Sequence, residues 1–370
     1  MSAPDELTFV LASCQYPAGL LDQTIAEASF LRLKKRLAHP ASRAMPKRLL
    51  LVGDTIYADA TAGLFDPTAQ YDRYNRRYDD LHTDTFSDVK KELQPLVMLD
   101  DHEIEDNWEP IEGDDTPRKT LAEALEAYRE PGRFSGPEPD GNSLWFRIQI
   151  EGFPFFMADT RTERSPRTAK NVEAAEIMSE TQFKALLEWL DVHAEMDLPK
   201  FIASPAILLP RRLRATLGSH PASALRSDAW DGYPRSLHRL LAHIADRNIR
   251  NVVFLSGDEH LSCVASAWLR SPKSPGPTLI VSVHSSALYA PFPFANSIPE
   301  DLAGDETFHF RQYDDEYSCR VETQFAAPGD GFAVLRTLKD PVSGKWKLCC
   351  RFDRDHRVSA APRRIDRLLS

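Results

Sequence analysis

The sequence has no hydrophobic run long enough to cross a membrane. A spanning helix needs about 20 apolar residues, and no stretch of this 370-residue chain approaches that length. The first residues, MSAPDELTFVLASC, contain neither the basic segment of a signal peptide nor a twin arginine. We therefore expect a cytoplasmic protein that has no membrane partner.

The sequence also lacks an excess of positive charge and the cysteine spacing of metal fingers. Its 45 basic residues are outnumbered by 55 acidic residues, which gives a net charge of −10. This balance argues against a protein held to nucleic acid by phosphate contacts, so nucleic acid stays only a possible substrate. The five cysteines include no C-x-x-C pair, which indicates reduced thiols.

Nothing in the sequence divides the chain into separate domains. It contains no repeat of fixed period and no Gly/Ser-rich linker. We therefore expect a single domain over residues 1–370, with a core at about residues 8–352 and a C-terminal tail or lid at residues 353–370. The ending RRIDRLLS fits either a short basic helix or a solvated tail.

Short apolar runs that end in polar residues predict buried strands. These runs occupy residues 8–13, 48–54, 95–101, 200–205 and 252–258, and residues 144–150 and 154–160 predict a hairpin. Residues 179–193 and 234–248 carry apolar side chains at helical spacing, and the last third resembles consecutive strands. The pattern predicts a mixed α/β and α+β fold of two packed sheets with helices outside.

Polar side chains that can carry chemistry follow five of the predicted strands. The segments are LASCQYP, LVGDTIYAD, LVMLDDHEIEDNW, FFMADTRTER and VFLSGDEH. Ligands of open α/β sheets bind at the carboxyl ends of the strands, so these groups are expected to meet at one edge. The sequence therefore predicts a metal site there.

The donor types favour two unlike metal ions. Asp54 is the candidate for a carboxylate that bridges both ions. A thiolate at Cys14 and a phenolate at Tyr57 favour iron(III), whereas the oxygen donors that follow suit a hard cation such as calcium. Those oxygen donors are Asp101, Asn107 and Asp258.

The ordered motifs SCQYP, GDTIYAD, DDHEIEDNW, DTR and SGDEH resemble the alkaline phosphatase D (PhoD-like) family of the calcineurin-like metallophosphatase superfamily. The resemblance implies a four-layer α/β/β/α sandwich of two mixed sheets flanked by helices. It also implies a metal-dependent phosphoesterase that uses iron(III) and calcium at alkaline pH. Manganese, cobalt, zinc and magnesium are the other metals that such a site accepts.

The resemblance assigns a role to each matching residue. The residues that would hold the iron are Cys14, Asp54, Tyr57 and His260. Asp54 would also serve the second ion, together with Asn107 and Asp258. Asp101 stands where the superfamily has the asparagine of its GNH motif, so the choice between Asp101 and Asn107 as direct ligand stays open.

Two further residues match groups that act on the phosphate. His102 would contact the phosphate or protonate the leaving group. Arg161 would hold phosphate oxygens with both arms of its guanidinium, or would pair with Asp159 to brace the strand end.

A second set of residues is predicted to line the substrate site or to support the ligands. Asp59 is expected to support a ligand or cap a turn, and the residues around WDGY are expected to form a substrate-facing wall or a helix entry. The full set is Asp59, Asp100, Asp159, Trp230, Asp231, Tyr233 and His284.

The expected reaction is hydrolysis of phosphodiesters, phosphomonoesters or both by a metal-bound hydroxide, with a small phosphate ester as substrate. One alternative is a nuclease or a phospholipase D-like phosphodiesterase. Another, from a different class, is a non-catalytic sensor of a phosphate ligand. A sensor predicts a missing ligand, yet every expected strand end still carries one. The oligomeric state is not predicted.

Overall fold

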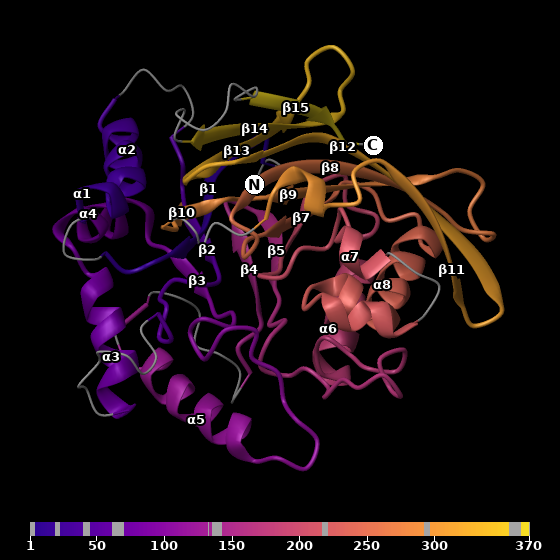
Figure 1. Ribbon diagram of the computed structural model, residues 1–370. Coiled ribbons are helices and arrows are strands. Elements are labelled where there is room, and N and C mark those ends of the chain that lie inside the picture. Colours follow the sequence, from indigo (N-terminus) through magenta and orange to yellow (C-terminus); the bar gives the residue numbers. More distant parts are fainter. Residues whose placement is uncertain are drawn as a thin grey trace.

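The computed structural model describes residues 4–18, 23–39, 45–60, 70–131, 133–134, 143–216, 221–291, 297–354 and 364–369 (Figure 1). Its helices are α1 (Gln23–Ala26), α2 (Ala28–Leu37), α3 (Gln70–Leu81), α4 (Asp84–Leu93), α5 (Thr116–Tyr128), α6 (Glu180–His193), α7 (Leu213–Thr216) and α8 (Pro234–Asp246), with 3-10 turns η1 (Pro221–Arg226), η2 (Trp230–Gly232) and η3 (Pro299–Asp301). None of the helices within these ranges is long and apolar enough to cross a membrane.

The strands of the described ranges form two sheets. The first has the order β15-β14-β13-β1-β2-β3, with β10 paired to β1, and the second has the order β11-β12-β8-β9-β7-β6-β5-β4. The bounds are β1 (Glu6–Gln15), β2 (Leu49–Val52), β3 (Leu96–Met98), β4 (Phe146–Ile150), β5 (Phe153–Met157), β6 (Lys200–Ala203), β7 (Val252–Ser256), β8 (Leu261–Arg270), β9 (Thr278–His284), β10 (Ala287–Tyr289), β11 (Glu306–Gln312), β12 (Asp315–Pro328), β13 (Gly331–Lys339), β14 (Trp346–Arg354) and β15 (Arg364–Leu368).

The two sheets pack against each other through a shared apolar cluster. Helices α1 to α5 lie beside the first sheet and α6 to α8 lie beside the second (Figure 1). Both sheets are mixed: β1, β2 and β3 are parallel, whereas β13 runs antiparallel to β1. In the second sheet, β5, β6, β7 and β9 run parallel to one another, whereas β4 is antiparallel to β5 and β8 is antiparallel to β9. The predicted two-sheet sandwich with flanking helices is confirmed.

Strand β2 explains why the predicted strands carry almost no polar residues. All four of its side chains are buried. Leu50 and Val52 belong to the apolar cluster between the sheets, whereas Leu49 and Leu51 belong to the cluster under α2 to α5. Because successive side chains of a strand point to opposite faces, a strand covered on both faces must be apolar throughout.

The two helices predicted with most detail start where the sequence indicates. The Ser179 hydroxyl accepts a hydrogen bond from the backbone N–H of Gln182 at 3.2 Å, which caps the N-terminus of α6. Gln182 itself does not complete the expected reciprocal cap, because its side-chain amide bonds the backbone N–H and C=O of Asp159. Pro234 occupies the first turn of α8, as expected of a residue that has no N–H to satisfy.

The prediction of a helix or a solvated tail at the C-terminus is wrong for residues 364–368. These residues form β15, which pairs antiparallel with β14 from Lys347 opposite Leu368 to Arg351 opposite Arg364. The sequence RIDRL alternates, so Ile365 packs against the cluster between the sheets while charged neighbours stay exposed. Residues 355–363 and residue 370 of the predicted tail or lid lie outside the described residues.

Candidate metal centre

The ends of strands from both sheets meet at the predicted site. Cys14 lies at the end of β1, Asp54 follows β2, and Asp258 follows β7 of the other sheet. Gly257 permits this approach, because a Cβ at that position would lie 2.5 Å from the carbonyl oxygen of Val52. Only a residue without a side chain lets the end of β7 come this close to β2.

Several predicted ligands have a backbone conformation that is unusual for residues other than glycine. Positive φ angles of this kind occur mostly where a sharp turn or a functional constraint demands them. These residues lie at or just beyond the ends of strands β1, β2 and β7, directly before β8, or in the loop after β3. Their φ angles are 57° for Cys14, 53° for Asp54, 53° for Asn107, 78° for Asp258 and 51° for His260.

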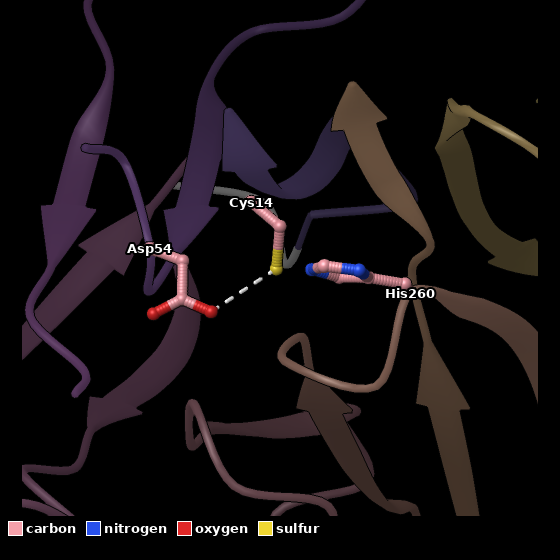
Figure 2. A group of neighbouring side chains, drawn as sticks. All are labelled: Cys14, Asp54 and His260. Atoms are coloured by element: carbon pink, nitrogen blue, oxygen red, sulfur yellow. Dashed lines mark hydrogen bonds between the residues drawn. The ribbon is translucent and has the colours of Figure 1, made fainter. Parts of the chain in front are cut away.

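The predicted iron ligands are close to one another. Figure 2 shows Cys14, Asp54 and His260 facing one another from three strand ends, and their ligand atoms lie within 4.8 Å of one another. The Cys14 Sγ is 3.3 Å from Asp54 Oδ2. The Tyr57 hydroxyl lies 2.8 Å from His260 Nε2, so the phenol borders the same group.

A second group of oxygen donors shares Asp54 with the first. The ligand oxygens of Asp54, Asp100, Asp101 and Asp258 lie within 4.8 Å of one another. Asn107 borders a cavity that Asp101 and Asp258 also border. Its backbone N–H donates to Asp101 Oδ2 at 2.7 Å. Asp100 was expected only to support the ligands, but its position makes it a candidate ligand too. The carboxylate of Asp54 thus belongs to both groups.

The electrostatics of these groups favour bound cations. Burial, together with Asp101 and Asp100, raises the pKa of Asp54 well above its usual range, and burial with Asp54 does the same for the Cys14 thiol. Burial and the charge of Asp228 likewise raise the pKa of Asp258. Crowded carboxylates in a dry site favour protonation unless a cation neutralises them.

Buried carboxylate oxygens in this cluster also lack hydrogen bonds. Among the described residues, Asp100 Oδ2, Asp101 Oδ1 and Asp258 Oδ2 have no hydrogen-bond partner. Buried polar atoms of native proteins nearly always have a partner, and a metal ion is one such partner. The donor set therefore fits the hard cation predicted for this position.

His102 and Asp59 form a hydrogen-bonded pair at the cavity wall. The His102 Nδ1 lies 2.9 Å from Asp59 Oδ2, and the same oxygen accepts the Asp106 N–H at 2.7 Å. Burial opposes the charged imidazole, but Asp101 and Asp59 outweigh it and raise the pKa of His102 to about 10. The Asp59 carboxylate therefore orients the histidine ring, and its support of a metal ligand stays a prediction.

Glu103 holds the ends of β2 and β3 together and was not among the predicted residues. Its carboxylate accepts the backbone N–H groups of Asp54 at 3.0 Å, Thr55 at 2.5 Å and Asp100 at 2.8 Å. Burial raises its pKa to about 7. The glutamate lies inside the motif DDHEIED, so its position in the sequence was a usable signal.

The predicted contact between Arg161 and a phosphate is contradicted. The Arg161 side chain is fully buried and does not border the cavity. Its Nε donates to Asp100 at 2.6 Å and its Nη2 donates to Asp228 at 3.1 Å. Asp159 does not pair with the guanidinium either, because it accepts the backbone N–H groups of Arg161 and Thr162 at 2.9 Å. Arg161 neutralises these carboxylates from the protein interior. Asp159 stabilises a turn by accepting its backbone N–H groups.

The expected substrate-facing wall at Trp230, Asp231 and Tyr233 is also contradicted. Trp230 and Tyr233 are fully buried in the apolar cluster under the second sheet, and none of the three borders the cavity. The indole N–H of Trp230 donates to the Ser204 hydroxyl at 2.9 Å. The two aromatic side chains are core residues, as their size and lack of exposure dictate.

His284 lies next to the site but does not join either metal-binding group. It is buried at the end of β9, and its Nδ1 lies 2.8 Å from the Ser256 hydroxyl. Burial lowers its pKa to about 3, so the ring is neutral. The prediction of a functional role for His284 remains a prediction.

A cavity of about 510 Å³ is bordered by His260 of the first group and by Asp101 and Asp258 of the second. Seven of its charged side chains were not predicted: Asp106, Arg212, Arg214, Asp228, Glu259, Glu300 and Asp301. Glu259 lies inside the motif GDEH and Asp228 precedes the AWDG segment, whereas the run LPRRLR around Arg212 carries no signal that distinguishes it from a surface loop. The cavity is large enough for a small phosphate ester.

Comparison with known proteins identifies the family. The family model described as PhoD-like phosphatase matches residues 9–318. The chain belongs to the PhoD-like phosphatase family. This PhoD-like chain is 28% identical over 182 residues to alkaline phosphatase D of Bacillus subtilis (strain 168), and the match covers 45% of this chain and 31% of that protein. A solved structure described as the structure of PhoD superposes on 99% of this chain and 69% of its own, with a TM-score of 0.66 at 16% identity.

Proposed function

We propose that this PhoD-like protein is a hydrolase that cleaves small phosphate esters with the help of two metal ions. The observation that supports the proposal best is the pair of donor groups that share Asp54. Family membership supports the same reaction class. Metal ions at these positions would supply an activated water and positive charge to the phosphate.

The donor atoms favour an iron(III) ion and a harder cation such as calcium. Iron would be held by Cys14, Asp54, Tyr57 and His260, since thiolate and phenolate donors suit iron(III). Calcium would be held by Asp54, Asp258, and Asp101 or Asn107, with Asp100 beside them. Manganese, cobalt, zinc and magnesium are the competing ions.

The chain itself supplies the group that acts on the leaving oxygen. His102 borders the cavity, and the Asp59 carboxylate fixes its Nδ1 as a hydrogen-bond donor, which leaves the Nε2 side to serve the substrate. A protonated imidazole in this place donates a hydrogen bond or a proton to the departing alcohol oxygen. Asp59 acts through His102 and is a positioning residue.

The cavity favours a small substrate over a nucleic acid. Asp106, Glu300 and Asp301 border the cavity and are exposed. Acidic side chains at a cavity mouth oppose the approach of a polyanion. A phosphodiester with one negative charge is opposed less strongly, so we place small phosphodiesters before nuclease substrates and before doubly charged monoesters.

Metal analysis combined with turnover tests the proposal. The protein is assayed with bis(p-nitrophenyl) phosphate and p-nitrophenyl phosphate at pH 7 and pH 9, before chelation, after chelation and after metal is restored. We expect turnover that is lost on chelation and restored by metal, together with visible absorption from an iron phenolate. Tight phosphate binding without turnover of either ester would indicate a sensor. A colourless protein without iron would refute the iron assignment.

A further inference from the structure

Two arginines border the cavity from a segment that the metal motifs do not include, and Arg212 is the less exposed of them. Arg212 borders the cavity beside Asp228, Asp258 and Glu259. Its Nη2 pairs with Glu259 and lies 3.6 Å from Asp228 Oδ1 and 3.7 Å from Asp258 Oδ2. The side chain is 12% exposed. The guanidinium is therefore next to the second group of donors and is open to the cavity on one side.

We propose that Arg212 is the residue that binds the phosphate oxygens of the substrate. This assignment rests on the proposed function and adds to it a substrate-binding residue that is unrelated to the metal motifs. A planar guanidinium presents several N–H donors in a fork that matches two phosphate oxygens.

The backbone of Arg212 is fixed from two sides. Its N–H donates to Asp231 Oδ2 at 2.6 Å, and the other oxygen of Asp231 accepts the Ser227 hydroxyl at 2.5 Å. Arg212 also forms an isolated antiparallel bridge with Leu302. A binding group held in place before the ligand arrives loses little entropy on binding. Asp231, predicted to form the wall, thus supports the arginine that borders the cavity.

The side chain of Arg212 retains unused hydrogen-bonding capacity. Its Nε is buried and has no hydrogen-bond partner within the described ranges of the chain. Glu259, which pairs with Nη2, also accepts the Ser297 hydroxyl and is buried. Because the Nε–H of Arg212 is shielded from solvent, a phosphate in the cavity would be bound by the part of the guanidinium that borders it.

The rival arginine is already occupied. Arg161 gives its donors to Asp100 and Asp228 and has no exposed surface. It lies 3.5 Å from Asp101 on the side away from solvent. Both arginines pair with carboxylates, but Arg161 has no surface toward the cavity, whereas Arg212 borders it.

Phosphate affinity measured by calorimetry tests the assignment without turnover. Inorganic phosphate is titrated into metal-loaded wild type, Arg212→Met and Arg212→Lys. We expect the methionine variant to bind phosphate roughly ten- to a hundredfold more weakly, as the loss of charged hydrogen bonds predicts, with the lysine variant in between. Metal content measured on the same samples is expected to match wild type.

Two control variants separate binding from other roles. Arg211→Met removes the same charge from the neighbouring residue, which pairs with Glu306 outside the cavity, and phosphate affinity is expected to stay within about threefold of wild type. Arg214→Met removes an exposed arginine at the cavity mouth. A loss of phosphate affinity in the Arg214 variant that exceeds the loss in Arg212→Met overturns the assignment.

The outcomes distinguish this inference from the proposed function. Unchanged phosphate affinity in Arg212→Met, loss of metal from that variant, or no phosphate binding by wild type overturns the role of Arg212. A wild type that binds metal and phosphate through Arg212 but hydrolyses no ester refutes the proposed function and leaves the binding role of Arg212 intact.

Discussion

Replacing Arg161 by methionine is expected to destabilise the fold by about 3–5 kcal/mol, the penalty typical of a buried ion pair that loses one partner. The magnitude follows from the positive charges that remain near the buried carboxylates after Arg161 is removed. Asp228 keeps Arg212 at 3.6 Å, but the buried Asp100 and Asp101 keep no other ion pair with a lysine or arginine in the described part of the chain. The variant thus leaves Asp100 without a counter-charge, and Asp101 keeps the positive charge of the nearby His102.

The assay is the free energy of unfolding in urea, measured on metal-free protein so that bound ions do not mask the difference. Arg336→Met is a suitable control, because Arg336 pairs with Glu6 at 2.6 Å but 37% of its side chain is exposed. We expect that control to change stability by less than about 1 kcal/mol. Adding Asp100→Asn to Arg161→Met should restore part of the loss, because the uncompensated charge is removed.

The reasoning is refuted if Arg161→Met unfolds within about 1 kcal/mol of wild type. A variant that folds as stably as wild type but has a raised KM would return Arg161 to the phosphate-binding role that the sequence predicts.

Two further predictions concern the histidines. Asp59→Ala is expected to lower kcat about tenfold to a hundredfold with KM and metal content little changed, because His102 loses the carboxylate that orients it. His238 stacks on Phe310 at 4.6 Å, and burial lowers its pKa to about 4. As the pH is lowered, the histidine of the unfolded state, with its ordinary pKa of about 6.5, binds a proton before the histidine of the folded state does. The free energy of unfolding should therefore fall from pH 6.5 to pH 4, by up to about 1.4 kcal/mol per pH unit. His238→Leu should flatten this slope in urea unfolding.

Each of these predictions has an outcome that contradicts it. Loss of metal from Asp59→Ala would place Asp59 in the metal site itself. Parallel pH–stability curves for wild type and His238→Leu would show that this histidine does not titrate differently in the folded protein.

Much of the fold could be predicted because burial on both faces leaves a strong signal. Strands β2, β3, β6 and β7 fall within the predicted runs, and α6 and α8 begin at the residues that the caps indicate. The sequence did not reveal β8, whose run LSCVASAWLR follows the motif GDEH without a turn signal of its own. It also misled at β15, where charged residues alternate along an edge strand and look like a solvated tail.

The proximity of the candidate ligands could be predicted for a related reason. Parallel strands bring their carboxyl ends together, so Cys14 and Asp54 meet although 40 residues separate them. Spacing along the chain says nothing about which side of such a cluster a residue takes. Arg161 and Arg212 are both arginines near strand ends, but the first contacts the carboxylates from the core and the second borders the cavity. That distinction depends on packing alone.

The count of bound metal ions in wild type and in Asp54→Asn is the most direct test of the account. Mass-spectrometric metal analysis of wild type should find two ions per chain, and the variant should lose at least one of them while keeping the circular dichroism spectrum of the folded protein. Retention of both ions in Asp54→Asn, or a fully active wild type that contains no metal, would contradict the claim that Asp54 is shared between two metal ions.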